Sequence, residues 1–500
     1  MKLKILALLL IALLVLSACT PTNPETPGTN PGGEGGSSDG GSGTVVGTDI
    51  GRDDVSYGES IRDLGAYDGL FDGTAHNVKI NCVSGTPGCY KVEGNTIVFT
   101  PVSAESVYSI SGELSGNIVI NTGDLYKFEL ELSGLSLVSD STNPISVFSG
   151  DEVSIQAKKG TKNYIYDLRE TIPETDTLSV SDAIYSEVDL EISGKGKLFV
   201  VSNNNGIHSK KDLQVKNLDL LVSCLDNALK GNDSVELENS TATLIASAGD
   251  AVKTSNSDIS NKGNQRGTVS VISGSYDLYS ACDGIDAAYD VTVSGGSIGI
   301  FTDGFSAYTE NNVGALSSKG IKASNKITLS GGNIQIRSTD NAIHASNTSP
   351  LENGVNPVGS ISISGGDISV YTRAETIHSD GILYLKGGRM LLLSTSDGHS
   401  AISAGKGYTY SAGEVVAIMS DGEAASGATN CVGFNNIGKQ VSLSLSMGEY
   451  LTCTVGSAKL ILRMPLSLNS SVVMLGASNA AAEVSSTGLS GLPVGSFIWE

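Results

Sequence analysis

The chain has 500 residues, with 53 acidic against 31 basic side chains and a formal charge of −22 at neutral pH. Such an excess of negative charge excludes a protein that grips nucleic acid or an anionic membrane through its overall field. Glycine and β-branched residues fill the apolar segments and no segment keeps a 3.6-residue period, which argues against a helical protein.

Residues 1–18 have the pattern of an export signal. Lys2 and Lys4 precede an apolar stretch from Ile5 to Leu16, which is shorter than the roughly 20 residues that a membrane span needs. The Leu-Ser-Ala-Cys segment that ends at Cys19 resembles the lipobox of bacterial lipoproteins. This resemblance implies cleavage before Cys19, a lipid on that cysteine, and a place in the cell envelope outside the cytoplasmic membrane.

Residues 19–52 are predicted to form a disordered tether. Proline, glycine, serine, threonine and asparagine dominate residues 20–48, and such a composition cannot bury a core. A flexible chain of this length spans about 30 Å on average. We therefore expect a folded body that the lipid on Cys19 attaches to a membrane.

A four-residue phrase recurs through the middle of the chain. It consists of an opening turn residue, a small residue, an aliphatic residue and a polar residue that follows it. Between phrases lie short segments of alternating polar and apolar residues, broken by Gly-Gly or Gly-Ser bends. The aliphatic positions are Ile184, Ile207, Leu229, Val252, Ile285, Ile321, Ile343, Ile377 and Ile402.

The spacing of the phrase predicts the architecture. Successive aliphatics lie 22 to 25 residues apart, or 33 to 36 apart where a loop intervenes. This spacing indicates an all-β fold, a right-handed parallel β-helix with three strands per coil. A propeller is the alternative, but its blades of about 40–45 residues conflict with the short spacing. We assign an N-terminal cap and first irregular coils to residues 53–180, regular coils to 181–410, and a β-rich C-terminal cap to 411–500.

The residue after each aliphatic is expected to point outward, because side chains alternate along a strand. From coil to coil these outward positions form a line of mostly basic or ionisable residues, which Asp286 interrupts. One hypothesis is a groove for an extended acidic polysaccharide, whose carboxylates would meet successive basic side chains. The other is a structural ladder, in which Lys and Asp on neighbouring coils neutralise each other. The six basic or ionisable members, called the basic row below, are His208, Lys230, Lys253, Lys322, His344 and His378.

The opening residue of most phrases is Asp or Asn, and these side chains suit a turn because they cap backbone groups. Calcium binding is the alternative interpretation, since stacked turns would gather the oxygen ligands that Ca²⁺ prefers. The predicted calcium ligands are Asp226, Asp250, Asp283 and Asp286. A second acidic group, which the sequence leaves open, is Asp167, Glu170, Glu174 and Asp176.

Six cysteines remain besides Cys19, and an exported protein can form disulfides. Cys82 and Cys89 flank a turn that contains glycine and proline, so we predict a disulfide between them. Cys431 with Cys453 is a second expected pair. The chain has no CxxC motif, which argues against a zinc site built from thiolates.

Catalytic motifs are few. The GxSxG match at residues 295–299 coincides with a bend that sibling coils fill with Asn333 and Asp367. A polyuronide lyase would need a Lys or Arg base with a lowered pKa and a cation on the substrate carboxylate. Lys230, Lys253 and Lys322 qualify by residue type, and nothing distinguishes one of them.

Several segments resemble a family of bacterial carbohydrate-binding β-helix proteins. These segments are Asn205-Gly-Ile-His-Ser-Lys-Lys-Asp-Leu213, the Asp-Asn-Ala-Leu-Lys-Gly phrase that ends at Gly231, and the Ser-Gly-Gly-x-Ile bends. The likeness covers about residues 72–480. It implies a pectate-lyase-like fold, bound calcium, and polysaccharides such as polygalacturonate or cellulose as partners, without known lyase activity.

Three functions follow as hypotheses. The first is a surface-anchored, monomeric, non-catalytic protein that binds an acidic polysaccharide such as polygalacturonate and holds structural calcium. The second is a calcium-dependent, pectate-lyase-like polysaccharide lyase. The third is an adhesin or envelope spacer without a glycan site. No nucleic-acid partner is expected.

Overall fold

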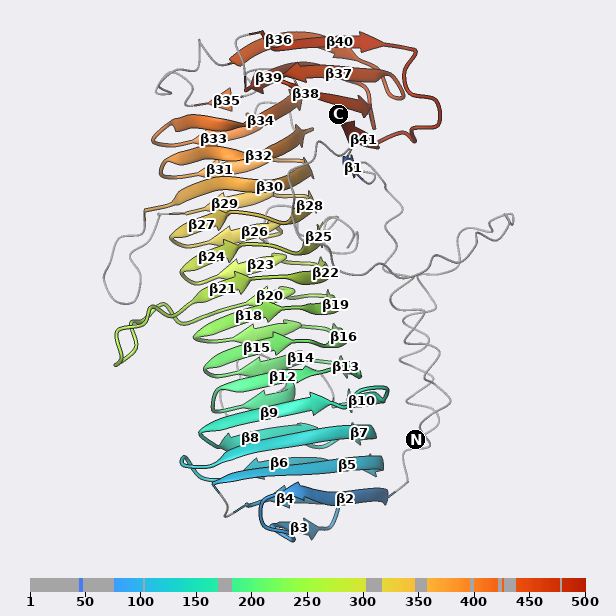
Figure 1. Ribbon diagram of the computed structural model, residues 1–500, viewed down its shortest axis with the longest axis vertical. Helices are drawn as coiled ribbons and strands as arrows, with labels where there is room; N and C mark the ends of the chain where they lie inside the picture. Colours follow the sequence, from blue (N-terminus) through green and yellow to red (C-terminus); the bar gives the residue numbers. More distant parts are fainter. Residues whose placement is uncertain are drawn as a thin grey trace. The chain divides into compact units, whose positions relative to one another are not determined.

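The chain folds into stacked coils of short β-strands. The computed structural model describes residues 45–47, 76–101, 104–169, 182–302, 317–346, 358–395, 400–420, 425–426, 438–476 and 479–500. Strands of successive coils pair in parallel, one coil after another (Figure 1). The predicted right-handed parallel β-helix with three strands per coil is thereby confirmed. The described part of the chain contains no helix that could span a lipid bilayer.

The first face of the helix carries the recurrent phrase. Its strands pair in chain order and in parallel from Thr96 onward, so regular coils begin well inside residues 53–180. The strands are β3 (Tyr90–Glu93), β4 (Thr96–Phe99), β6 (Asn117–Asn121), β8 (Ile145–Ser149), β11 (Asp182–Ser186), β14 (Asn205–Ser209), β17 (Leu229–Gly231), β20 (Val252–Lys253), β23 (Ile285–Ala287), β26 (Ile321–Ala323), β29 (Ile343–Ala345), β31 (Ile377–Ser379), β33 (Ile402–Ala404) and β35 (Ala425–Ser426).

The second and third faces follow the first within each coil. The second face contains β9 (Glu152–Ala157), β12 (Leu190–Gly194), β15 (Asp212–Lys216), β18 (Ser234–Glu238), β21 (Thr268–Val271), β24 (Asp290–Val293) and β27 (Lys326–Leu329). The third contains β10 (Lys162–Asp167), β13 (Lys197–Ser202), β16 (Asp219–Cys224), β19 (Ser240–Ala246), β22 (Gly274–Ser280), β25 (Ser297–Phe301) and β28 (Asn333–Ser338). Five longer strands bend across both faces: β5 (Glu105–Ser115), β7 (Lys127–Ser139), β30 (Ser360–Thr372), β32 (Leu383–Ser394) and β34 (Tyr408–Ser420).

The aliphatic residues of the phrase form a column inside the coils. Ile184 lies opposite Ile207, which lies opposite Leu229, and all of the phrase aliphatics from Ile184 to Ile402 are fully buried. Burial of such a side chain stabilises a fold by about 1.5–3 kcal/mol. The inward direction predicted for these residues is therefore confirmed, and it fixes the residue after each of them on the outer surface.

The first coil begins with an antiparallel pair. β2 (His76–Ser84) pairs antiparallel with β5, and β3 pairs antiparallel with β4. The disulfide predicted between Cys82 and Cys89 in this region is wrong, because both thiols are free. The turn between the two cysteines closes around the Tyr108 hydroxyl instead. That hydroxyl donates to the carbonyl of Thr86 and accepts the Cys89 N–H, while the Cys82 thiol donates to the Ser84 carbonyl.

The other end of the helix carries a second sheet and a second core. β36 (Gly438–Leu445) and β34 flank β39 (Leu468–Leu475), and both pair antiparallel with it. A five-stranded antiparallel sheet runs in the order β1 (Val45–Gly47), β41 (Phe497–Trp499), β38 (Ala458–Arg463), β37 (Tyr450–Val455) and β40 (Ala481–Ser485). Val45–Gly47 thus forms a strand within the range 19–52 predicted as disordered, because it adds an edge to the C-terminal sheet.

Candidate functional site

The opening residues of the phrase form a hydrogen-bonded ladder between coils. The Oδ1 atom of Asn205 accepts the N–H of Asn227, and Oδ1 of Asn227 accepts the N–H of Asp250. Oδ1 of Asp250 accepts the N–H of Asp283 at 2.7 Å, and Oδ1 of Asp283 accepts the N–H of Lys319 at 2.7 Å. These side chains are buried, so each bond satisfies a backbone donor that water does not reach. The geometry favours the turn-capping interpretation of these residues.

The basic row lies in one register on the first face. His208 is opposite Lys230, Lys230 is opposite Lys253, Asp286 separates Lys253 from Lys322, and His344 lies between Lys322 and His378. The structure therefore brings together all six residues that were predicted to share a line. A row member can attract an acidic glycan only if its positive charge is not already paired with a carboxylate of the protein.

Aspartates engage two of the three lysines of the row. Lys253 Nζ lies 2.5 Å from Asp250 Oδ2 and 3.5 Å from Asp286 Oδ2. Lys322 Nζ lies 3.1 Å from Asp283 Oδ2 and 3.2 Å from Asp286 Oδ1. Burial alone would lower the pKa of each lysine, but the aspartates outweigh it and raise the pKa of both. The two side chains are thus held as ammonium ions by internal partners, which suits neither a proton-abstracting base nor a polyanion groove.

At the His208 end of the row, the described side chains have no aspartate–lysine ion pairs of this kind. His208 is buried, with Nδ1 at 3.1 Å from Asp182 Oδ2 and Nε2 at 3.1 Å from Asn232 Oδ1, so both ring nitrogens have partners. Lys230 makes no ion pair with any described residue and is partly exposed. It is the one lysine of the row whose charge no carboxylate in the described structure compensates.

Three of the four predicted calcium ligands lie together, and lysines of the basic row already contact them. Asp250, Asp283 and Asp286 bring carboxylate oxygens within 4.8 Å of one another, but these oxygens already receive Lys253, Lys322 and the ladder N–H groups. Calcium would have to displace both ammonium groups, because it needs six to eight oxygen ligands. Asp226 is not part of this cluster and instead accepts the side-chain amide of Asn227.

One member of the second acidic group, Asp167, lies among the described residues. Asp167 is buried and forms a bidentate pair with Arg169, with Oδ1 at 2.8 Å from Nε and Oδ2 at 2.7 Å from Nη2. Such a fork-to-fork pair already satisfies both oxygens of the carboxylate. The other three members of this group, Glu170, Glu174 and Asp176, lie outside the described residues.

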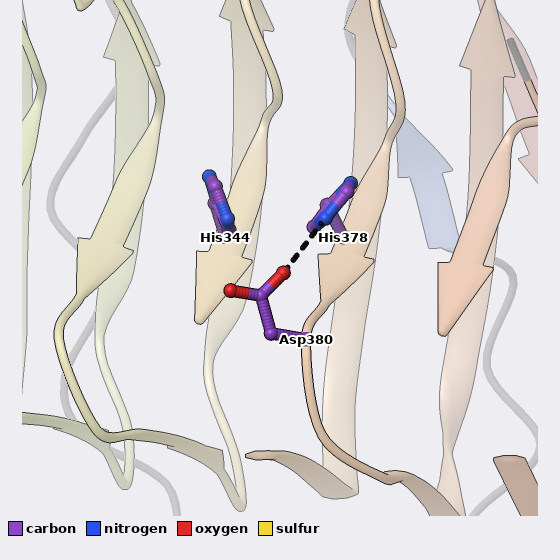
Figure 2. Close-up of side chains that lie close together, drawn as sticks. All are labelled: His344, His378 and Asp380. Carbon is purple, nitrogen blue, oxygen red and sulfur yellow. Dashed lines mark hydrogen bonds and ion pairs between the residues drawn. The ribbon is translucent and has the colours of Figure 1, made fainter. Parts of the chain in front are cut away.

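His344 and His378 are neighbours on β29 and β31, and Asp380 follows His378 by two residues (Figure 2). The imidazole rings have centroids 4.6 Å apart, and His378 Nε2 lies 3.1 Å from Asp380 Oδ1. Burial, His378 and Lys319 lower the pKa of His344 to about 4, whereas Glu375 raises that of His378. His344 is consequently neutral at pH 7, so this end of the row offers no second cation to a polyanion.

An open groove of about 640 Å³ lies on the outer side of the second face, away from the basic row. Its floor follows one outward position through five coils: Glu129, Ser154, Glu191, Gln214 and Glu236. Seven carboxylates and one lysine line the groove, in a set that comprises Glu105, Ser106, Val107, Lys127, Phe128, Glu129, Glu152, Val153, Ser154, Asp189, Leu190, Glu191, Asp212, Leu213, Gln214, Ser234 and Glu236. We call it the acidic groove.

The acidic groove holds more negative than positive charge. Burial and the nearby carboxylates of Glu131, Glu191 and Glu105 raise the pKa of Glu129. Lys127 compensates Glu152 at 2.7 Å, and Lys216 pairs with Glu191. The Gln214 amide donates to Glu236. The floor therefore alternates between strong hydrogen-bond acceptors and groups that can also donate, at the spacing of about 4.8 Å that separates adjacent strands.

The family model for "Carbohydrate-binding domain-containing protein" matches residues 93–360, which is more than half of the chain. The chain belongs to this family. The matched range contains the whole acidic groove, from Glu105 to Glu236, and the basic row as far as His344. His378 and Asp380 lie beyond its end.

A curated member of the carbohydrate-binding domain family from Acetivibrio thermocellus is 28% identical to this chain over 117 residues. The aligned segment covers 23% of this chain and 41% of the relative, so the chain spans less than half of that protein's length. A solved structure described as the polysaccharide lyase-like protein from C. thermocellum, a gadolinium derivative, is 21% identical. The alignment covers 62% of this chain and 96% of the chain in that structure, with a TM-score of 0.36.

Sequence reasoning placed the basic row correctly but missed the acidic groove. The groove residues are of different types in each coil, so the recurrent phrase does not reveal them. A signal was nevertheless present, because Glu129 and Glu131 alternate with apolar residues and hence share the outward side of one strand. Asp380 was also missed, although it follows His378 by two residues, directly after the end of β31.

Proposed function

We propose that this protein binds an extended polysaccharide without cleaving it, and that the polysaccharide lies in the acidic groove. The observation that carries the proposal is an open groove across five coils whose floor repeats hydrogen-bonding side chains. Sugar hydroxyl groups donate well to carboxylates and accept from amides and hydroxyls. Membership of the carbohydrate-binding domain family supports a glycan as the ligand.

The charge of the groove favours an uncharged polysaccharide over the acidic one expected from the sequence. Seven carboxylates would repel a uronate chain, and Glu129 already feels like charges from its own neighbours. Lys253 and Lys322, the cations expected to hold uronates, are engaged by aspartates. A neutral glycan gains the hydrogen bonds of the groove without this repulsion.

An acidic polysaccharide bridged by calcium is the second candidate. The excess of carboxylates around Glu129 favours it, because a divalent cation between them and a uronate would relieve the repulsion on both sides. This candidate needs calcium as a co-ligand of the glycan rather than as a part of the fold. Polygalacturonate retained only in the presence of Ca²⁺ would support it.

A non-catalytic role is supported by the state of the lysines that a lyase would use as a base. The pKa of a catalytic lysine is lowered toward neutral, whereas aspartates raise the pKa of Lys253 and Lys322. Lys230 remains the lysine to replace in a lyase test, since it makes no ion pair with a described residue.

We also propose that a lipid on Cys19 holds the protein in the cell envelope, facing outward. The motif that ends at Cys19 and the tether-like composition behind it support this placement. Cells that express the chain would incorporate labelled palmitate into it, and Cys19→Ala would abolish the label. Incorporation into the Cys19→Ala variant would contradict the anchor.

Retention and cleavage can be measured together. Purified protein would be run through gels that contain a neutral glucan, xylan or polygalacturonate, with Ca²⁺ or with EDTA, while ultraviolet absorbance reports unsaturated product. We expect retardation by a neutral polysaccharide in EDTA and no product with any substrate. Product formation that Lys230→Ala abolishes would establish a lyase, and no retardation in any gel would favour a spacer.

A further inference from the structure

Two histidines of the basic row lie side by side, and one of them, His344, has no hydrogen-bond partner among the described residues for either ring nitrogen. His344 and His378 each follow a fully buried isoleucine, so both side chains point outward from adjacent strands. The neighbouring row positions are Lys322, which two aspartates engage, and Ser403, which is small. The pair therefore forms a separate group at this end of the row (Figure 2).

Asp380 adds a carboxylate to the pair. One ligand atom from each of His344, His378 and Asp380 can be chosen so that all three atoms lie within 4.8 Å of one another. In a tetrahedral zinc site the ligand atoms are roughly 3.4 Å apart, given Zn–N bonds of about 2.0–2.1 Å. Binding would therefore draw the three ligand atoms closer together through rotation of the side chains.

The two ring nitrogens of His344 are unsatisfied within the described structure. Nδ1 and Nε2 are both buried, and neither has a hydrogen-bond partner. A neutral imidazole carries one N–H donor and one lone pair, and leaving such groups buried and unpaired is unfavourable. His208, at the other end of the row, has a partner for each nitrogen. A ligand that accepts a lone pair from His344 would remove this deficit.

We propose that His344, His378 and Asp380 bind a divalent transition metal ion, with Zn²⁺ as the best match. Two imidazoles and one carboxylate are a donor set that zinc takes with a fourth position left for water or another oxygen ligand. Ca²⁺ is a poor match, because it prefers an all-oxygen shell of six to eight ligands. The site is independent of the acidic groove and of the glycan proposed to lie there.

The surroundings support the donor set. Glu375 Oε1 lies 3.7 Å from Nδ1 of His378, on the other side of the ring from Asp380, where a carboxylate orients a metal-bound histidine. Lys319 is the nearby cation, and Asp340 compensates it at 2.5 Å. Residues 344 and 378 belong to successive coils, so a bound ion would cross-link the stack of strands at this point.

The test is a titration of metal-free, full-length protein. Protein stripped with EDTA and dialysed would be titrated with ZnCl₂ in a calorimeter, with CaCl₂ as the comparison, and its melting temperature followed with and without Zn²⁺. We expect one saturable zinc site, a rise in melting temperature with zinc, and visible d–d absorption when Co²⁺ replaces Zn²⁺. Calcium should not compete for this site.

Substitution of a zinc ligand by a residue that already occupies another position of the row tests zinc binding without disturbing the fold. His378→Ser introduces the residue that occupies position 403, and His344→Lys introduces the residue at position 322. Each should weaken zinc binding about 100-fold or abolish it, and Asp380→Asn should weaken it about tenfold. His208→Gln is the control and should bind zinc like the parent. The proposal is overturned if the parent shows no saturable zinc binding, or if His344→Lys and His378→Ser bind as the parent does.

Discussion

At the residue scale, the side chain that opens a phrase accepts a backbone N–H of the next coil. Two substitutions at position 250 test this role. Asp250 Oδ1 accepts the buried N–H of Asp283, a bond that Asn205 and Asn227 make in their own coils. Asp250→Asn keeps an acceptor for this N–H and loses the ion pair with Lys253, which Asp286 still engages at 3.5 Å. Asp250→Ala loses the same ion pair and also leaves that N–H unpaired, so it should cost about 1–3 kcal/mol more than Asp250→Asn. Urea denaturation measures both, and equal losses would contradict the ladder.

Glu129 links stability to pH through its raised pKa. Its folded-state pKa lies above the unfolded value, so its contribution to stability is full below the unfolded pKa of about 4.3 and is lost as pH rises through the folded value. At pH 7 the ionised side chain therefore destabilises the fold. Glu129→Gln should raise the melting temperature at pH 7 relative to the parent, and this gain should vanish near pH 4. A gain that is the same at both pH values would contradict the assignment.

The row of outward side chains could be predicted from sequence, but its charge state could not. Alternation along a strand is local, so the register of Lys253 and Lys322 follows from the phrase. The partner of Lys322 is Asp283, which lies 39 residues earlier and across a loop insertion. Such a contact depends on how coils stack, which the phrase does not encode. The free thiols of Cys82 and Cys89 escaped prediction similarly, because Tyr108 enters their turn from another strand.

At the element scale, the bends between the second and third faces depend on glycine because successive coils approach closely there. Gly366 has a φ of +94°, and a Cβ added to it would lie 2.9 Å from the carbonyl oxygen of Gly332 in the preceding coil. Gly263 has a similar φ of +84°, but a Cβ there would meet nothing within 4 Å. A side chain at either position would strain the backbone. Only a side chain at position 366 would also clash with a neighbouring coil.

This contrast predicts different costs for the same substitution. Gly263→Ala should lower the free energy of unfolding by about 1 kcal/mol, which is the backbone term alone. Gly366→Ala should cost about 1–3 kcal/mol more, because the added methyl group pushes against the preceding coil. Chemical denaturation of the two variants measures the difference. Similar losses would show that coil stacking tolerates a Cβ at the bend.

The strands of the first face were easier to predict than those that build the acidic groove. Aliphatic residues recur at the inward positions of the first face and mostly Asp or Asn at the opening positions, which makes the coil period visible. The groove floor contains Glu, Ser and Gln in turn, and its first coils precede the first full phrase at Asp182. A pattern of residue types therefore predicts the fold, whereas the groove emerges only when the coils are stacked.

At the scale of the whole folded body, the C-terminal sheet covers an apolar outer surface of the last coils. Leu391, Leu393, Val416 and Ile418 are fully buried in the second core, together with residues of the C-terminal strands. Removal of residues 438–500 would expose these side chains and the edge strand β34, which invites edge-to-edge association. We expect the truncated protein to form large assemblies in size-exclusion chromatography with light scattering. A monomeric truncated protein with the parent's melting temperature would contradict this role for the cap.

The central claim is that a polysaccharide lies in the acidic groove, and one outward row supplies both a blocking variant and its control. Ser154 lies on the floor between Glu129 and Glu191, whereas Thr328 occupies the same row three coils beyond Glu236 and outside the groove. A tryptophan at either position adds the same bulk to the same outer surface.

The decisive measurement is the affinity of Ser154→Trp and Thr328→Trp, by calorimetry, for the polysaccharide that the parent retains best. We predict that Ser154→Trp lowers the affinity at least about tenfold, which corresponds to about 1.4 kcal/mol. Thr328→Trp should stay within about twofold of the parent. Unchanged binding by Ser154→Trp would contradict the account and move the glycan site away from the groove.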